Sequence, residues 1–134
     1  MNTHVKICGL TRPEDVEAAI RSGASFLGFI VEAKSARRLS VVQAAKLSLP
    51  AKSSAKTVAV TVNANDELIE AIITQMQPDY IQLHGDESVD RVAEIARNFT
   101  TKTIKAIPVS TPADMITAEQ YAGCLLYTSD AADE

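Results

Sequence analysis

Two residues near the amino terminus, Lys6 and Cys8, are of types that could do chemistry together. The stretch from Val5 to Leu10 reads Val-Lys-Ile-Cys-Gly-Leu, and its alternation up to Gly9 predicts a short strand that ends in a turn. In such a strand Lys6 and Cys8 share one face. A nearby cation favours the thiolate of a cysteine, which can act as a base or a nucleophile. On residue type alone, the competing interpretation of Cys8 is a small apolar filler.

The elements that would position this pair alternate between strands and helices. Strands are predicted at residues 5–8, 26–31, 57–63, 79–84 and 102–109, and helices at 11–22, 41–49, 65–76, 88–98 and 111–121. Strands that recur every 20 to 30 residues or so, with a helix between them, run parallel because each helix returns the chain to the same edge of the sheet.

Two architectures fit this order, an intact five-stranded flavodoxin-like open sheet and a (β/α)8 TIM barrel cut off partway. An open sheet needs central strands that are apolar on both faces. Four of the strands instead have one polar face each, carrying Lys6 and Cys8, Thr61 and Asn63, Gln82 and His84, and Lys105. Polar side chains from several strands are typical of a barrel mouth. The sequence therefore predicts a truncated barrel, with five βα units and a sixth strand begun after residue 123.

Composition narrows the class of protein. The chain has 134 residues, 46% hydrophobic and 22% charged, with a formal net charge of -4. We therefore expect one globular domain and neither a nucleic acid nor a membrane as partner. The sequence shows no signal peptide or membrane span, which favours the cytoplasm. Its two cysteines, Cys8 and Cys124, match no metal-binding spacing and no disulfide framework, so neither feature is expected.

Four segments together resemble one enzyme family. They are Val-Lys-Ile-Cys-Gly-Leu at 5–10, Lys-Ser-Ala-Arg-Arg at 34–38, Val-Asn at 62–63 and Ile-Gln-Leu-His-Gly-Asp-Glu at 81–87. In order and spacing they resemble phosphoribosylanthranilate isomerase of tryptophan biosynthesis, a branch of aromatic amino-acid biosynthesis. The resemblance implies a (β/α)8 barrel that carries out an Amadori rearrangement, from aminoaldose to aminoketose, without any cofactor or metal.

The resemblance also implies roles for residues. Cys8 matches the general base that removes the sugar C2 proton, and Arg37 matches the arginine that holds the anthranilate end. His84 lies in the family's active-site motif, and Gln82 and Asn63 are further candidates for binding the small-molecule substrate, phosphoribosylanthranilate. The competing interpretations are a solvated charge for Arg37, a strand-end histidine for His84, and side chains that only orient neighbours for Gln82 and Asn63.

Two other functions stay open on the sequence. A flavodoxin-like ligand-binding module would need an acidic pocket or a glycine-rich phosphate loop after the first strand, and Cys8-Gly9-Leu10-Thr11 supplies neither. The second alternative is another sugar-phosphate barrel isomerase. Cys8 distinguishes the two, because the related aminoaldose isomerase of histidine biosynthesis uses a carboxylate at that position. Oligomeric state is not predicted.

The resemblance ends near residue 123. Residues 124–134 read Cys-Leu-Leu-Tyr-Thr-Ser-Asp-Ala-Ala-Asp-Glu, which is similar to a translated sequencing adapter, so we expect a barrel part at 1–123 and a non-native tail at 124–134. Tyr127 stands where the family has the aspartate that acts as general acid, and Asp130 is three positions late. With no phosphate-binding loops after a seventh and an eighth strand, this chain is expected to be an inactive fragment.

Overall fold

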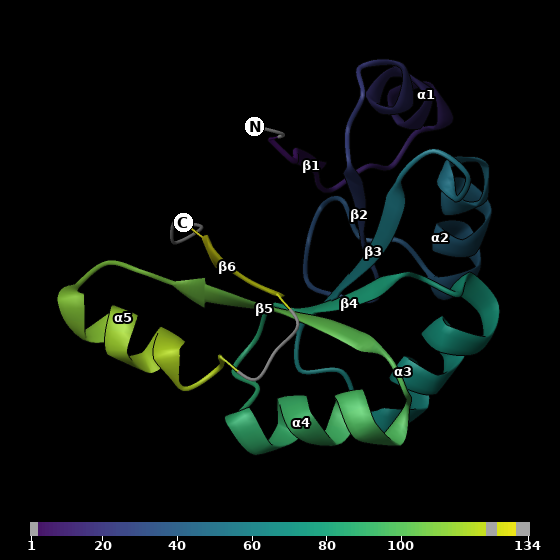
Figure 1. The fold of residues 1–134 in the computed structure, drawn as a ribbon. Helices are drawn as coiled ribbons and strands as arrows, with labels where there is room; N and C mark the ends of the chain where they lie inside the picture. Colours follow the sequence, from purple (N-terminus) through teal and green to yellow (C-terminus); the bar gives the residue numbers. More distant parts are fainter. Residues whose placement is uncertain (1–2, 123–125, 131–134) are drawn as a thin grey trace.

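The computed structural model of the chain describes residues 3–122 and, as backbone, residues 126–130. Its strands are β1 (Lys6–Ile7), β2 (Phe26–Ile30), β3 (Lys56–Thr61), β4 (Tyr80–Leu83), β5 (Lys102–Pro108) and β6 (Leu126–Asp130). Its helices are α1 (Pro13–Arg21), α2 (Val41–Ser48), α3 (Asp66–Ala71), α4 (Val89–Asn98) and α5 (Pro112–Glu119), with a 3-10 turn at Leu49–Ala51 and a π-helical turn at Ile72–Met76. Figure 1 shows the helices around the outside of a curved sheet.

The strand order distinguishes between the two predicted architectures. All the strands run parallel and pair in sequence order from β1 to β6. A flavodoxin-like sheet has the order 2-1-3-4-5 and helices on both faces, whereas here the helices line the convex side only (Figure 1). The prediction of a truncated barrel is therefore confirmed, and the open-sheet alternative is wrong.

Two apolar cores lie on opposite sides of the sheet. The larger one joins the outward faces of the strands to the helices and includes Leu27, Ile69 and Ile81, all of them fully buried. The smaller one lies on the concave side, where Val58, Val60 and Ile104 pack together. Burial on both sides explains why the strands are so rich in branched apolar residues.

The polar faces predicted for β3 and β5 are partly wrong. Thr61 pairs with Leu83, and Leu83 pairs with Lys105; Leu83 belongs to the core beneath the helices. Thr61 and Lys105 therefore lie on the helix side, away from the barrel interior. Thr61 is tolerated there because its hydroxyl donates a hydrogen bond to the carbonyl of Gln82 at 3.2 Å, which satisfies a buried polar group.

Side-chain caps begin three of the helices just after the loops that leave the strands. Ser40, Asn65 and Ser88 each accept the backbone N–H three residues further on, at the starts of α2, α3 and α4. Each cap supplies a partner for an N–H that the first helical turn leaves unpaired. In consequence, each of the loops that follow β2, β3 and β4 is held by a capping hydrogen bond at the point where it enters the next helix.

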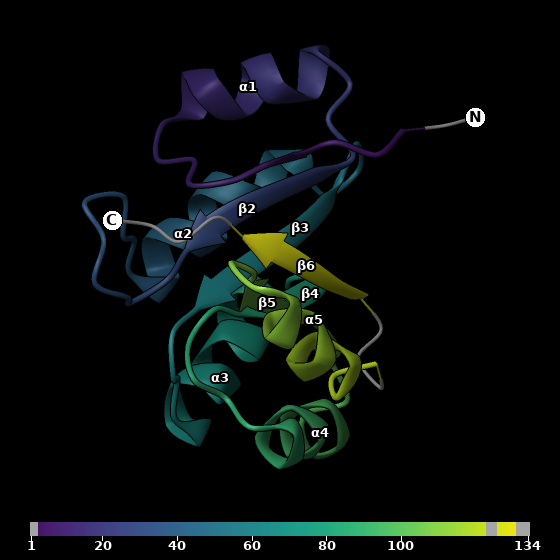
Figure 2. The ribbon, with the colours of Figure 1, turned by 90° about the vertical axis from the view of Figure 1, so that its left-hand side faces the viewer.

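The outer side of β1 is covered by a single helix. Figure 2 shows α1 lying along β1 and β2 at one margin of the molecule, with α4 toward the opposite margin. The last strand, β6, pairs with β5. No helix within residues 3–122 is long and apolar enough to cross a membrane. The predicted tail boundary at residue 124 falls just before β6; Cys124 and residues 131–134 lie outside the described residues.

Candidate active site

The turn after β1 places the Cys8 side chain on the concave side of the sheet. Gly9 has a φ of +79°, a conformation that glycine adopts without steric cost. The N–H groups of Gly9 and Leu10 both donate to the carbonyl of Gly28, at 3.0 and 3.2 Å. Strand alternation then puts Lys6 and Cys8 on the same face, as the sequence predicted.

Gly28 makes room for the thiol. A Cβ at Gly28 would come within 2.9 Å of the Cys8 sulfur, which is closer than side-chain contacts allow. Cys8 is exposed, so the interpretation as a buried apolar filler is wrong. The role of Gly28 was missed from the sequence, although a glycine inside an apolar strand is itself a signal of close approach.

Arg37 reaches the same turn from the loop after β2. Its Nη1 donates to the carbonyl oxygen of Cys8 at 3.4 Å, and its guanidinium covers Gly9. Its backbone N–H donates to Ser35 Oγ at 3.1 Å, which fixes the loop locally. The neighbouring Arg38 instead turns back and donates to the carbonyl of Ser35. Of the two arginines, only Arg37 contacts the Cys8 turn.

Gln82 and His84 come together at the end of β4. Gln82 Nε2 lies 3.3 Å from His84 Nδ1, within hydrogen-bond distance. The ammonium of Lys6 donates to Gln82 Oε1, so Lys6 bridges β1 and β4 across the concave side. Gln82 is only 2% exposed. A nearly buried amide held by two partners has one fixed orientation, and this fixes the polar side chains around it.

Asn63 lies apart from this face. The strand alternation predicted from the sequence ends before it, because Asn63 has a φ of +49°. Its side-chain oxygen accepts the N–H of Asp86 at 2.8 Å, and a Cβ on Gly85 would collide with that same amide group. Asn63 therefore joins the loop after β3 to the loop after β4.

A buried ion pair beneath these loops was not predicted as part of the site. Lys105 Nζ lies 2.9 Å from Glu87 Oε1, and their side chains are 4% and 3% exposed. Burial acts to raise the pKa of Glu87, but hydrogen bonds from Lys105 and from the backbone of Asn63 outweigh it, so the pKa lies below its ordinary value. Glu87 stands directly before the helix predicted at 88–98, and nothing in that segment indicates a partner on another strand.

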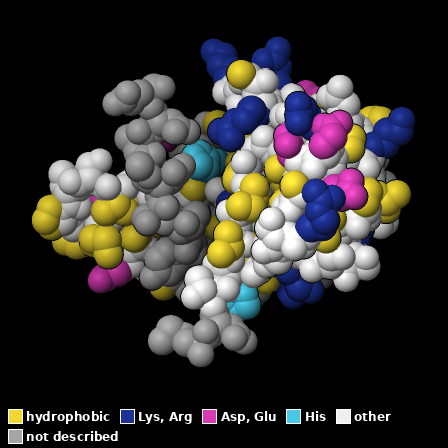
Figure 3. All heavy atoms as spheres, turned by 90° about the horizontal axis from the view of Figure 1, so that it is seen from above, with side chains coloured by type: hydrophobic (Ala, Val, Ile, Leu, Met, Phe, Trp, Pro, Cys, Tyr) yellow, Lys and Arg dark blue, Asp and Glu magenta, His cyan; other side chains and the backbone are white. Residues whose placement is uncertain are grey.

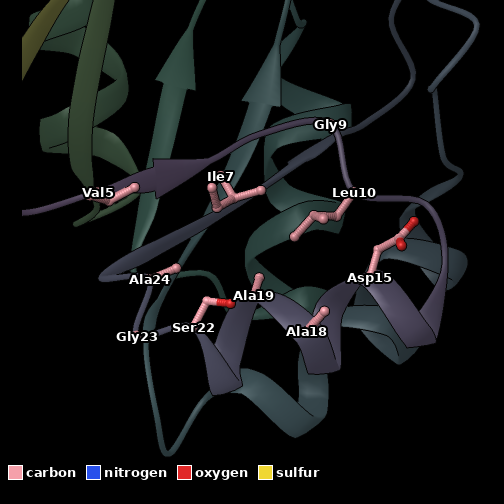
Figure 4. A pocket seen from close by; sticks show the side chains of 10 residues that line it. All are labelled: Val5, Ile7, Gly9, Leu10, Asp15, Ala18, Ala19, Ser22, Gly23 and Ala24. Atoms are coloured by element: carbon pink, nitrogen blue, oxygen red, sulfur yellow. The ribbon is translucent and has the colours of Figure 1, made fainter.

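One groove beside β1 lies on the face opposite Cys8. It lies between β1 and α1 and is lined by Val5, Ile7 and Leu10 together with small residues of α1 (Figure 4). Val5 and Ile7 alternate with Lys6 and Cys8, so they point to the opposite side of the strand.

The side chains that could bind a metal ion and the side chains exposed on the surface indicate which ligands the chain could hold. Among the residues that the structure describes, no three histidine, cysteine or acidic side chains lie close enough to hold a metal ion. On the face seen in Figure 3, basic side chains are interspersed with acidic ones, and apolar side chains are exposed over α5. Met115 and Ile116 of that helix are 56% and 65% exposed.

Comparison with known proteins places the chain among relatives of one kind. A family model described as N-(5'phosphoribosyl)anthranilate (PRA) isomerase matches residues 5–130. The N-(5'-phosphoribosyl)anthranilate isomerase of Parvibaculum lavamentivorans is 43% identical over 121 residues, which are 90% of this chain and 56% of that protein. The enzyme of that name from Rhodopseudomonas palustris is 42% identical over 91% of this chain and 57% of its own length. The chain thus spans little more than half the length of these relatives.

Solved structures agree with the sequence relatives. The crystal structure of phosphoribosyl anthranilate isomerase from Thermotoga maritima superposes with a TM-score of 0.89 at 31% identity, covering 99% of this chain and 64% of that one. A second structure of such an isomerase, in complex with reduced 1-(o-carboxyphenylamino)-1-deoxyribulose 5-phosphate, gives a TM-score of 0.87 at 32% identity, with 96% and 66% covered. Sequence and fold together show that the chain belongs to the phosphoribosylanthranilate isomerase family.

Proposed function

We propose that this chain carries the base-bearing part of an N-(5'-phosphoribosyl)anthranilate isomerase active site. The observation that carries the proposal is that Cys8, whose thiol is exposed at the end of the first strand, has its backbone carbonyl bonded by the Arg37 guanidinium. Cys8 lies over Gly28, and Arg37 bonds the Cys8 carbonyl from the next loop. A base and a carboxylate-binding group beside each other fit a substrate that has a carboxylate near a proton to be removed.

The chemistry assigned to Cys8 is proton abstraction. In the Amadori rearrangement the ribose ring opens when its ring oxygen takes up a proton and its bond to C1 breaks, which leaves a protonated imine between the sugar C1 and the anthranilate nitrogen. The Cys8 thiolate then takes the proton from C2, and the electron pair of that C–H bond moves to form the enamine. Transfer of a proton to C1 and loss of the C2 hydroxyl proton give the aminoketose. No oxidant or reductant is needed.

The other side chains hold the substrate in this proposal. Arg37 takes the anthranilate carboxylate, for which its planar fork is suited. Gln82 and His84 face the sugar from β4, where their mutual contact fixes them. Asn63 completes the predicted substrate-binding set; it lies in the loop after β3 and accepts the N–H of Asp86 from the loop after β4.

We further propose that the 134-residue polypeptide binds but does not turn over the substrate. Tyr127 pairs with Lys105 in the sheet register, in the strand where the family resemblance implies the general acid. A phenol titrates near pH 10 and is a poor substitute for a carboxylic acid near neutrality. The proposed division into a barrel part at 1–123 and a foreign tail at 124–134 accounts for this substitution. Genomic DNA that continues past codon 123 with a Leu-Phe-Asp strand would support it, and a natural stop after Glu134 would contradict it.

The experiment measures binding and turnover separately on the purified chain. Isotope-labelled protein is titrated with reduced 1-(o-carboxyphenylamino)-1-deoxyribulose 5-phosphate and followed by NMR, and conversion of the fluorescent substrate is followed in parallel. We expect shifts at Cys8 and His84, weaker binding in Arg37→Ala, and unchanged binding in the matched control Arg38→Ala. No shift in the wild-type chain would overturn the proposed site. Conversion that Cys8→Ser abolishes would overturn the proposed inactivity.

A further inference from the structure

The buried ion pair of Glu87 and Lys105 lies directly beneath the loop after β4. Their side chains are 3% and 4% exposed, so the pair has almost no contact with solvent. Burying two charges is costly, and apolar residues of similar size would stabilise a protein as well or better. A role in stability alone is therefore a weak explanation of this pair, and the contacts around it indicate another.

Lys105 binds the backbone on both sides of His84. Its Nζ donates to the carbonyl oxygens of Leu83 at 3.3 Å and Gly85 at 2.7 Å, in addition to Glu87. Since Leu83 and Gly85 are the residues that flank His84, the backbone of this histidine is held at both neighbours by one ammonium group. Lys105 itself is fixed in β5, whose pairing with β4 places it beside Leu83.

Glu87 binds the backbone of the neighbouring loop as well as its own. Its carboxylate accepts the N–H of Gly85 at 2.9 Å and the N–H of Asn63 at 2.8 Å. Asn63 in turn accepts the N–H of Asp86. One carboxylate therefore ties together the loops after β3 and β4, through hydrogen bonds that its negative charge strengthens.

A tyrosine closes the cluster from the outside. Tyr121, just after α5, donates its hydroxyl to the carbonyl of Glu87 at 2.7 Å. The Lys105 ammonium lies 5.6 Å from the centre of the Tyr121 ring, within the range of a cation–π contact. The pair is thus enclosed between the sheet, the β4 loop and the end of α5.

We propose that Glu87 and Lys105 are positioning residues, which set the placement of His84 and Asn63 for substrate binding. They act through the backbone at Leu83, Gly85 and Asn63 and touch no substrate themselves. The part of this inference that concerns substrate rests on the proposed function. The part that concerns the placement of His84 stands on the contacts alone, so the two can fail separately.

The test compares two single variants with the double variant. Lys105→Met and Glu87→Gln each leave a buried polar group without its partner, and both are expected to lower the melting temperature. The double variant Glu87→Gln/Lys105→Met removes both charges and is expected to regain most of that loss, so it stays folded even if a single variant does not. Glu17→Gln, in the exposed pair with Arg21, is the matched control and should change nothing.

The decisive readout is the imidazole NMR spectrum of the double variant. The chain has two histidines, and His4, which lies in another pocket with Ser25 and Lys56, is an internal reference. We expect the ring signals of His84 to move while those of His4 stay, because Leu83 and Gly85 lose their shared donor. Affinity for reduced 1-(o-carboxyphenylamino)-1-deoxyribulose 5-phosphate should fall about tenfold, as for a lost hydrogen bond to a charged group.

The outcomes separate the two claims. If the double variant regains stability together with wild-type His84 signals, the pair is only structural and the inference is overturned. If the His84 signals move but the wild-type chain binds no analogue, the positioning of His84 is upheld and the proposed function fails. If the His84 signals move and analogue affinity is unchanged, the link from this pair to substrate binding is overturned.

Discussion

Arg37 donates a hydrogen bond to the backbone carbonyl of Cys8, with Nη1 3.4 Å from the oxygen. The two residues are separated by a strand and a helix in the sequence, yet the guanidinium lies where any side chain on Gly9 would have to be. The thiol and the cation of the proposed site are therefore placed by one backbone turn. Changes at that turn should affect both groups at once.

Gly9→Ala tests this relationship, with Gly23→Ala as the matched control. Gly9 and Gly23 have φ angles of +79° and +83°, so alanine at either position should cost about 1 kcal/mol or more in unfolding free energy. Only at Gly9 would the new Cβ meet Arg37; around Gly23 nothing lies within 4 Å. We expect similar losses in urea unfolding but weaker analogue binding in Gly9→Ala alone. Equal binding by both variants would show that Arg37 does not depend on the turn.

The pKa of Glu87 predicts a dependence of stability on pH. Burial raises this pKa, but hydrogen bonds from Lys105 and the Asn63 backbone bring it below the ordinary value of 4.5. The folded state then keeps the carboxylate charged at a pH where the unfolded chain takes up a proton. The stabilisation is present above pH 4.5 and is lost as the pH falls through the lower folded-state pKa.

Urea unfolding from about pH 6 to about pH 3 measures this effect. Asp114 also has a lowered pKa, because it accepts hydrogen bonds from the backbone of Ser110 and Thr111, and it contributes with the same sign. The contribution of Asp114 to the pH dependence is the same in the wild type and in Glu87→Gln/Lys105→Met, so it cancels when the two are compared. The wild type should lose more stability on acidification than the double variant. Parallel curves would contradict the assignment.

The cap of α2 makes a third prediction, about the loop that carries Arg37. Ser40 accepts the N–H of Gln43 at 3.1 Å, and the Gln43 side chain accepts the N–H of Ser40 at 2.9 Å. Ser40→Ala should lower the unfolding free energy by about 1 kcal/mol. Ser53→Ala, at an exposed serine in a turn, is the control and should stay within about 0.5 kcal/mol of the wild type. Thermal or urea unfolding distinguishes the two.

Much of the fold could be predicted because its signals are local. The two-residue period of β1 was enough to place Lys6 and Cys8 on one face, and the alternation of strands with helices was enough to predict parallel pairing. The family resemblance named Cys8 and Arg37 as members of one site, and these roles stay predictions; the contact of the Arg37 guanidinium with the Cys8 carbonyl came from the structure. These features depend on neighbours in sequence, or on motifs that keep their spacing.

The features that were missed depend on register between strands. Lys105 meets Glu87 only because β5 pairs beside β4, and nothing in either segment alone indicates it. The sequence predicted Thr61 in the barrel interior because its side chain is polar. In the structure it is buried on the helix side, where its hydroxyl donates a hydrogen bond to the carbonyl of Gln82 on the next strand. Asn63 departs from the predicted alternation because its backbone is left-handed.

The shortness of β1 has a consequence for the energetics of ligand binding. Its register with β2 covers two residue pairs, whereas β2 and β3 share five. Backbone ordering costs free energy residue by residue, and among the described strands the one that precedes Cys8 has the shortest register to offset that cost. A ligand that binds both Arg37 and His84 would connect the turn after β1, at the edge of the sheet, with the end of β4 in its centre. Part of the binding free energy would then be spent on conformational entropy, and amide hydrogen exchange in β1 would slow on binding more than exchange in β3.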